Sequence, residues 1–277
     1  MEPFKPAAIA PGRWDVRESG PVDAEHTLLL LPGGMCTTVA MEPIMDALAP
    51  AAIRVVAATL PGFGRTWHPD DLSMENYAAL AAKLAADIGA DVVAGHSLGA
   101  NVALEMVAAG GFYGPVALLS PSFSREDEAK ELGTMNSVGR VPGIGLLAWT
   151  AMLKVMPRAM KSKLPAESAD VFAADLANND PRFCRALVRS YFEYLDRHGS
   201  LVPRLCESSV KAVVAFGDDD EIGLTDEERR GLEASPDVSL VTITEATHFM
   251  VVEQPAQIAK LICELAGVAS TPVAQRS

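Results

Sequence analysis

The sequence Gly-His-Ser-Leu-Gly at 95–99 combines a hydroxyl side chain with a glycine two positions away on either side. A short apolar run at 92–94 precedes it and a helix-like run at 101–109 follows, which predicts a strand, a tight turn and a helix. The central residue of such a turn has a strained backbone, and only glycines leave room for the strand and helix to pack beside it. The turn lifts the Ser97 hydroxyl clear of the sheet. It also directs the Leu98 N–H, at the helix start, toward negative charge on a substrate oxygen. These residues predict a serine nucleophile.

A serine hydroxyl needs a base to take its proton and an acid to hold that base in the right tautomer. Among the five histidines, His248 follows a predicted strand at 238–243 and precedes a helix predicted for 255–265. That order puts His248 at the carboxyl edge of the sheet, beside Ser97, and makes it the candidate base. His96 adjoins the serine on the tight turn and is expected to pack locally. The other histidines lie among polar residues and are interpreted as surface residues: His26, His68 and His198.

The candidate acids form a run of four carboxylates at 218–221, directly after a predicted strand at 210–216. Acidic runs of this kind are usually solvated surface. This run stands at a strand end, between the serine and His248 in the chain. One of its carboxylates is therefore expected to orient the histidine, while its neighbours stay solvated.

Alternating strand and helix patterns must position these side chains. Apolar runs that suit strands buried on both faces of a parallel sheet occur at 26–31, 53–58, 92–96 and 116–120. Helical periodicity separates them, so the first half of the chain predicts right-handed strand–helix–strand units and a mostly parallel sheet. Ligands bind at the carboxyl ends of such strands, where the glycine turn at 33–34 and Ser97 would both lie.

A block at 121–208 shows helical periodicity without a convincing strand, and strands resume at 210–216 and 238–243. Within it we expect helices at 146–155, which would stop at Pro157, at 166–177 and at 181–195. The predicted organisation is a core of residues 1–120 and 209–277 with an all-helical cap of residues 121–208. Because an insertion after a strand emerges at the same sheet edge as the nucleophile, this cap is expected to cover Ser97.

The composition excludes several classes of function. A formal net charge of −13 opposes nucleic-acid binding, and no apolar run approaches the length of a membrane span. Four scattered cysteines and an N-terminus without a secretory signal favour a cytoplasmic protein with free thiols. Neither a dinucleotide-binding fingerprint nor a phosphate-binding loop is present, so no cofactor and no metal are expected.

Taken together, these segments resemble the α/β-hydrolase family with an inserted helical cap, and the resemblance extends over nearly the whole chain. Residues 95–99 correspond to the nucleophile turn of that family, and the serine, the acid and the histidine follow one another along the chain in the family's order. Its acid turn places an aspartate three residues after a glycine, which falls on Asp220, and its histidine segment falls on His248. Its loop after an early strand matches Leu60-Pro61-Gly62-Phe63-Gly64.

The resemblance implies an oxyanion hole formed by the N–H groups of Gly34 and Leu98. The family usually has His-Gly before the first residue whose N–H donates to the oxyanion, whereas this chain has Pro32-Gly33 before Gly34. Proline cannot donate a backbone hydrogen bond. Because the donor falls on Gly34, the hole survives the change.

The expected function is that of a serine hydrolase acting on an ester, thioester or lactone, with Ser97, His248 and Asp220 as its triad. A C–C bond hydrolase or perhydrolase on the same triad, or a ligand receptor with slow turnover, stays open as an alternative. A serine disfavours family members with an aspartate nucleophile, such as haloalkane dehalogenases. Apolar cap residues predict a small-molecule substrate with an apolar portion: Leu146, Leu147, Trp149, Met152 and Met156. The sequence leaves the oligomeric state open.

Overall fold

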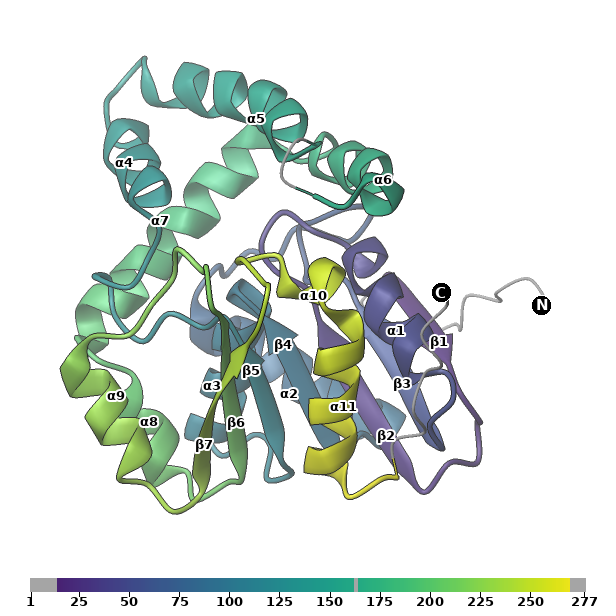
Figure 1. Ribbon diagram of the computed structural model, residues 1–277. Coiled ribbons are helices and arrows are strands. Elements are labelled where there is room, and N and C mark those ends of the chain that lie inside the picture. The colour runs from purple at the N-terminus through teal and green to yellow at the C-terminus, as the bar shows by residue number, and fades with distance from the viewer. Residues whose placement is uncertain (1–13, 162–163, 270–277) are drawn as a thin grey trace.

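The computed structural model describes residues 14–161 and 164–269. Within these residues, seven strands form one sheet (Figure 1). Their order in the sheet is β1 (Val16–Ser19), β3 (Ile53–Ala58), β2 (His26–Leu31), β4 (Val92–His96), β5 (Val116–Leu119), β6 (Ala212–Gly217) and β7 (Val238–Ile243). Strand β1 pairs with β3 in the antiparallel sense, and the other neighbouring strands are parallel. The mostly parallel sheet predicted from the apolar runs is thereby confirmed.

The central strands β2, β4 and β5 are buried on both faces, which explains why they are almost continuously apolar. Successive side chains point to opposite faces, so Leu29 and Leu31 belong to one buried cluster while Leu28 and Leu30 belong to the other. Helices α2 (Met74–Ile88), α3 (Leu98–Ala108) and α8 (Val202–Glu207) contribute to the first cluster. Helices α1 (Glu42–Leu48), α10 (Met250–Glu253) and α11 (Pro255–Ala266) cover the second face, at the front of Figure 1.

Several helix ends follow from single side chains. The Ser73 hydroxyl accepts a hydrogen bond from the Asn76 N–H and begins α2. Thr225 and Glu228 form the reciprocal capping box that begins α9 (Asp226–Glu233). Gly267, with φ 70°, ends α11 in the left-handed conformation that glycine adopts without strain.

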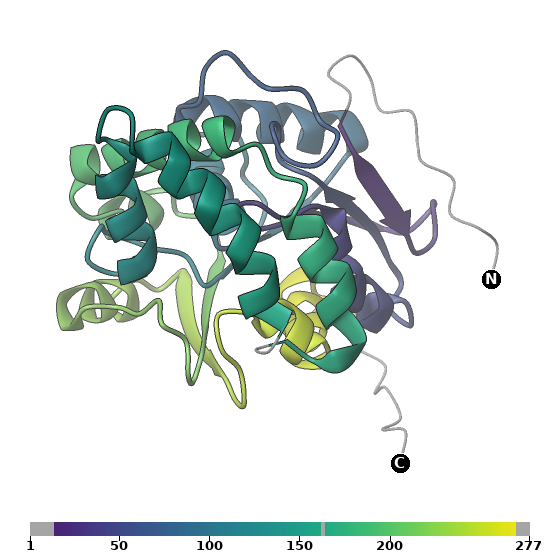
Figure 2. The same ribbon diagram turned by 90° about the horizontal axis from the view of Figure 1, so that it is seen from above.

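The insertion between β5 and β6 consists of α4 (Lys130–Gly139), α5 (Gly145–Lys161), α6 (Ala166–Leu176), α7 (Pro181–His198) and the short α8. Helices α4, α5 and α6 lie above the carboxyl ends of the strands, and α7 descends beside α3 (Figures 1 and 2). The expectation that the first long cap helix stops at Pro157 is wrong, because α5 continues to Lys161. Pro157 is buried, and the packing of α5 on α6 and α7 offsets the hydrogen bond that a proline cannot donate.

The division into a core of 1–120 and 209–277 and a cap of 121–208 stays a proposal. Helix α8 lies inside the cap by number but packs against α3 and α9. Helices α4, α5 and α6 are therefore the part of the insertion that stands over the sheet, while α7 connects them to the side of the core.

No helix in the described part of the chain is long and apolar enough to cross a membrane. All four cysteines are unpaired, with Cys206 half-buried and the other three buried.

Candidate active site

Ser97 lies at the turn between β4 and α3 with φ 51° and ψ −120°, a conformation that costs free energy for any residue with a side chain. The flanking glycines are required by close packing. A Cβ on Gly95 would lie 2.2 Å from the carbonyl oxygen of Gly99, and a Cβ on Gly99 would lie 2.3 Å from that of Leu31. The Ser97 N–H donates to the Leu119 carbonyl (2.8 Å), which ties the turn to β5. The strand, turn and helix predicted around Ser97 are thus present.

The loop after β6 brings Asp220 to His248. The Nδ1 atom of His248 lies 3.3 Å from Oδ1 of Asp220. Asp220 also accepts hydrogen bonds from the Ser120 hydroxyl (2.6 Å) and the Ile222 N–H (2.9 Å). Burial raises the pKa of Asp220, but the attraction of His248 and these hydrogen bonds outweigh burial and lower the pKa overall. Sequence reasoning missed Ser120, which has φ 50° and is fully buried at the end of β5.

Asp218 and Asp219, which precede Asp220 in the acidic run, differ in their hydrogen bonds. Asp218 accepts hydrogen bonds from the N–H groups of Glu245 and Ala246, both 3.0 Å long, and these bonds hold the turn that leads to His248. Asp218 is exposed, as expected of a solvated neighbour, but its hydrogen bonds to this turn were not predicted from the sequence. Asp219 is exposed, as expected.

His96 supports the histidine loop from below. Its Nε2–H donates to the main-chain carbonyl of His248 (2.8 Å), and the two rings are 4.9 Å apart. Burial, followed by repulsion from His248, lowers the pKa of His96 to about 3, so this ring stays neutral. The expected local packing of His96 is present and includes this hydrogen bond. His26, His68 and His198 lie away from the cavity described below.

Ser97 and His248 line one cavity of about 420 Å³ between the cap and the carboxyl ends of the strands. No hydrogen bond joins the two side chains directly within the described residues, and catalytic contacts of this kind often tighten only with substrate bound. Gly34 and Leu98 lie beside Ser97 along a smaller adjoining hollow of about 110 Å³. In the described parts of the chain, neither their N–H groups nor the Ser97 hydroxyl has a hydrogen-bond partner. The two N–H groups are thus available to an oxyanion.

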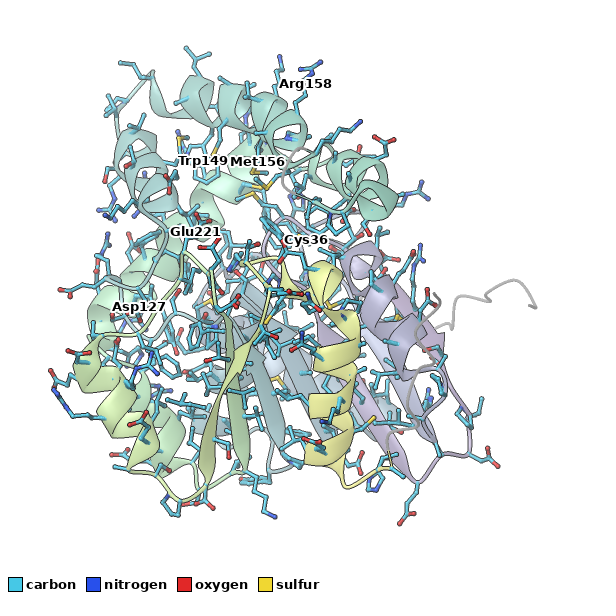
Figure 3. The ribbon with its side chains drawn as sticks, in the orientation of Figure 1. Cys36, Asp127, Trp149, Met156, Arg158 and Glu221 are labelled. Atoms are coloured by element: carbon cyan, nitrogen blue, oxygen red, sulfur yellow. The ribbon has the colours of Figure 1, made fainter. Side chains whose placement is uncertain are left out.

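The large cavity has an apolar, sulfur-rich roof. The large apolar side chains that line the cavity include Met35, Leu132, Met135, Met152, Met156, Met160, Phe172, Leu176 and Phe249. Met152, Met156 and Met160 recur every four residues along one face of α5. Figure 3 shows Met156 on the side of α5 nearest the sheet and Arg158 on the outer side.

Trp149 does not line the cavity, contrary to expectation. It is fully buried within the cap, and its Nε1–H donates to the Met135 carbonyl (3.2 Å). Leu147 is exposed, so helical periodicity alone did not distinguish the pocket residues from the packing and surface residues of α5.

Comparisons with known proteins show the family and the fold of this chain. The model of the alpha/beta hydrolase family matches residues 28–261, so the chain belongs to that family. No curated protein sequence matches the chain significantly.

Solved structures with the same fold include a thermophilic esterase from Thermogutta terrifontis, at 20% identity and a TM-score of 0.73, covering 95% of this chain and 97% of that one. A thioesterase domain from the curacin biosynthetic pathway matches at 16% identity and a TM-score of 0.67, covering 94% and 98%. E-2-(Acetamidomethylene)succinate hydrolase matches at 17% identity and a TM-score of 0.70, covering 92% and 95%. At these identities the similarity establishes the fold alone.

Proposed function

We propose that this chain is a cofactor-independent serine hydrolase that cleaves a carboxylic ester, thioester or lactone. Ser97 Oγ attacks the substrate carbonyl while His248 Nε2 takes its proton, and the N–H groups of Gly34 and Leu98 hold the oxyanion. His248 returns the proton to the leaving alcohol or thiol, which leaves an acyl group on Ser97. Water then attacks the acyl-enzyme by the same route and releases the acid. Asp220 keeps Nδ1 of His248 protonated, so that Nε2 can act as the base.

One observation carries the proposal. The cavity under the cap is lined by Ser97 on its strained turn and by His248, and His248 has the buried carboxylate of Asp220 behind it. A strained serine beside two unpaired N–H groups has no evident packing purpose, whereas an acyl-transfer site requires all of these parts.

The cavity supports a neutral substrate with an apolar portion. Methionine side chains adapt to varied apolar shapes, and three of them roof the site from α5. The lining also contains three carboxylates, Glu128, Glu131 and Glu221, and no lysine or arginine within the described residues. An anionic acyl group would therefore meet repulsion without a compensating cation.

The alternatives use the same residues differently. A C–C bond hydrolase or a perhydrolase would keep the triad, and a ligand receptor would bind tightly but turn over very slowly. No feature of the described residues favours any of these, so a substrate panel must separate them. The panel should contain esters, thioesters and lactones, because the chain shares its fold with an esterase and a thioesterase domain. It should also contain a β-diketone for C–C bond cleavage and an ester with hydrogen peroxide for perhydrolysis.

Covalent labelling tests the proposal most directly. A fluorophosphonate should phosphonylate Ser97 at one equivalent per chain, and mass spectrometry of the digest should locate the adduct. Ser97→Ala and heat-denatured wild-type protein are the controls and should carry no adduct. Absence of an adduct on the native protein, or an adduct on a different serine, would refute the mechanism.

A further inference from the structure

The loop that carries Gly34 is a strained turn. The Cys36 N–H donates to the Gly33 carbonyl (3.3 Å), which makes Gly34 and Met35 the two central residues of the turn. Met35 has φ 65°, which is unfavourable for a residue with a side chain. A turn of this kind persists only where the surrounding structure holds it.

The cap supplies part of that support. The Asn179 Nδ2–H donates to the Met35 carbonyl (2.8 Å), a bond between residues 144 positions apart in the chain. Asp175, in the last turn of α6, accepts hydrogen bonds from both the N–H (2.7 Å) and the hydroxyl (2.8 Å) of Thr37. Three hydrogen bonds therefore run from the junction of α6 and α7 to the residues that directly follow Gly34.

These contacts are partly shielded from water. Asp175, Asn179 and Met35 are each half-buried, and Thr37 is buried. Burial raises the pKa of Asp175, while the two Thr37 hydrogen bonds oppose that rise. Asn178, one position from Asn179, is exposed, and its side chain donates only to the Ala174 carbonyl of α6. The contacts with the turn are thus specific to two side chains of the junction.

We propose that Asp175 and Asn179 are positioning residues that hold the turn at 33–37 so that the Gly34 N–H points at the oxyanion. This inference rests on the proposed function, because it assigns a task to the same oxyanion hole. The oxyanion hole then depends on the cap, because the Gly34 N–H is correctly oriented only while the α6–α7 junction is hydrogen-bonded to the turn. Neither residue lines the cavity or the adjoining hollow.

The test compares Asn179→Ala and Asp175→Ala with the matched control Asn178→Ala. The substrate is a p-nitrophenyl ester with a short acyl group, which leaves the cap end of the cavity empty. We expect kcat to fall about 10- to 100-fold in the two variants, since a displacement of about 1 Å costs on the order of 10²-fold. KM should change by less than about threefold, because ground-state binding is left intact. The control should behave like wild type.

A second readout separates positioning from simple loss of cap packing. Phenylboronic acid forms a tetrahedral adduct with a serine and mimics the charged intermediate, so its inhibition constant should weaken in proportion to kcat. Asn179→Gln, which keeps an amide donor, should recover more activity than Asn179→Asp, which has nearly the size of asparagine but places an acceptor opposite the Met35 carbonyl. This pair keeps the test valid if the alanine variants do not fold.

The inference is overturned if kcat and boronate inhibition stay within about twofold of wild type in both alanine variants. It is also overturned if KM alone changes, or if Asn178→Ala loses as much activity. Failure of wild-type protein to label with a fluorophosphonate would instead refute the proposed function. Labelled wild type with fully active variants would refute only the positioning role.

Discussion

Asp220→Asn tests the proposed triad most sharply, because the structure fixes which way the new amide would point. The Ile222 N–H is a fixed donor to Oδ1 and requires an oxygen there, whereas the Ser120 hydroxyl can rotate and accept from an amide nitrogen. The asparagine should therefore present its oxygen to His248 and keep the histidine in the right tautomer. What the substitution removes is the negative charge behind His248.

The loss can be estimated from the geometry. With 3.3 Å between Nδ1 and Oδ1, a carboxylate stabilises the imidazolium that forms during catalysis by about 5 kcal/mol at an effective dielectric constant of about 20. That free energy corresponds to a fall in kcat of about 10³- to 10⁴-fold. Asp220→Ala should lose at least as much, since the histidine then also loses its orientation.

Steady-state hydrolysis of a p-nitrophenyl ester measures the effect, with Asp219→Asn as the matched control. The control changes the adjacent exposed aspartate in the same chemical way and should stay within about twofold of wild type. A kcat for Asp220→Asn within tenfold of wild type would show that the Asp220 charge is not used. A crippled Asp219→Asn would show that the wrong carboxylate has been assigned.

Four other substitutions test the cavity, the buried histidine and the core. Met156→Ala should shift the preferred p-nitrophenyl ester to a longer acyl chain, with each buried methylene contributing about 0.8 kcal/mol to binding. Trp149→Ala should destabilise the cap without that shift, because Trp149 is buried outside the cavity. If both variants show the same dependence of kcat/KM on acyl length, the assignment of Met156 to the cavity wall is wrong. Burial lowers the pKa of His96 to about 3. Between about pH 6.5 and pH 3 the unfolded chain therefore binds a proton at this histidine that the native chain does not bind. The free energy of unfolding should accordingly fall by about 1.4 kcal/mol for each unit by which the pH is lowered through this range. His96→Gln should flatten that slope in urea titrations, and an unchanged slope would refute the assignment. Arg204→Ala should lower the free energy of unfolding by about 3–5 kcal/mol, because it leaves the buried Glu105 carboxylate without its ion-pair partner; a loss below about 1 kcal/mol would contradict this.

The nucleophile turn and the helix ends could be predicted from the sequence because each depends on residues a few positions apart. Two glycines around Ser97 specify the turn, and Ser73 and Thr225 specify where α2 and α9 begin. The apolar runs specified a parallel sheet, since only strands covered on both faces are apolar throughout. The order of the serine, the acidic run and His248 along these strands then predicted that the three would lie at one edge of the sheet, and the resemblance to the family selected Asp220 from the acidic run.

Only the tertiary structure decided the parts that depend on distant residues. The contact of Ser120 with Asp220 spans 100 positions, and the bond from Asn179 to Met35 spans 144, so no local pattern encodes either. Periodicity identified α5 as apolar, but the packing of α5 against α4, α6 and α7 decided that Met156 faces the cavity while Trp149 is buried in the cap. The same packing keeps α5 helical beyond Pro157, because the free energy of tertiary contacts exceeds the low helix propensity of a proline when enough surface is buried.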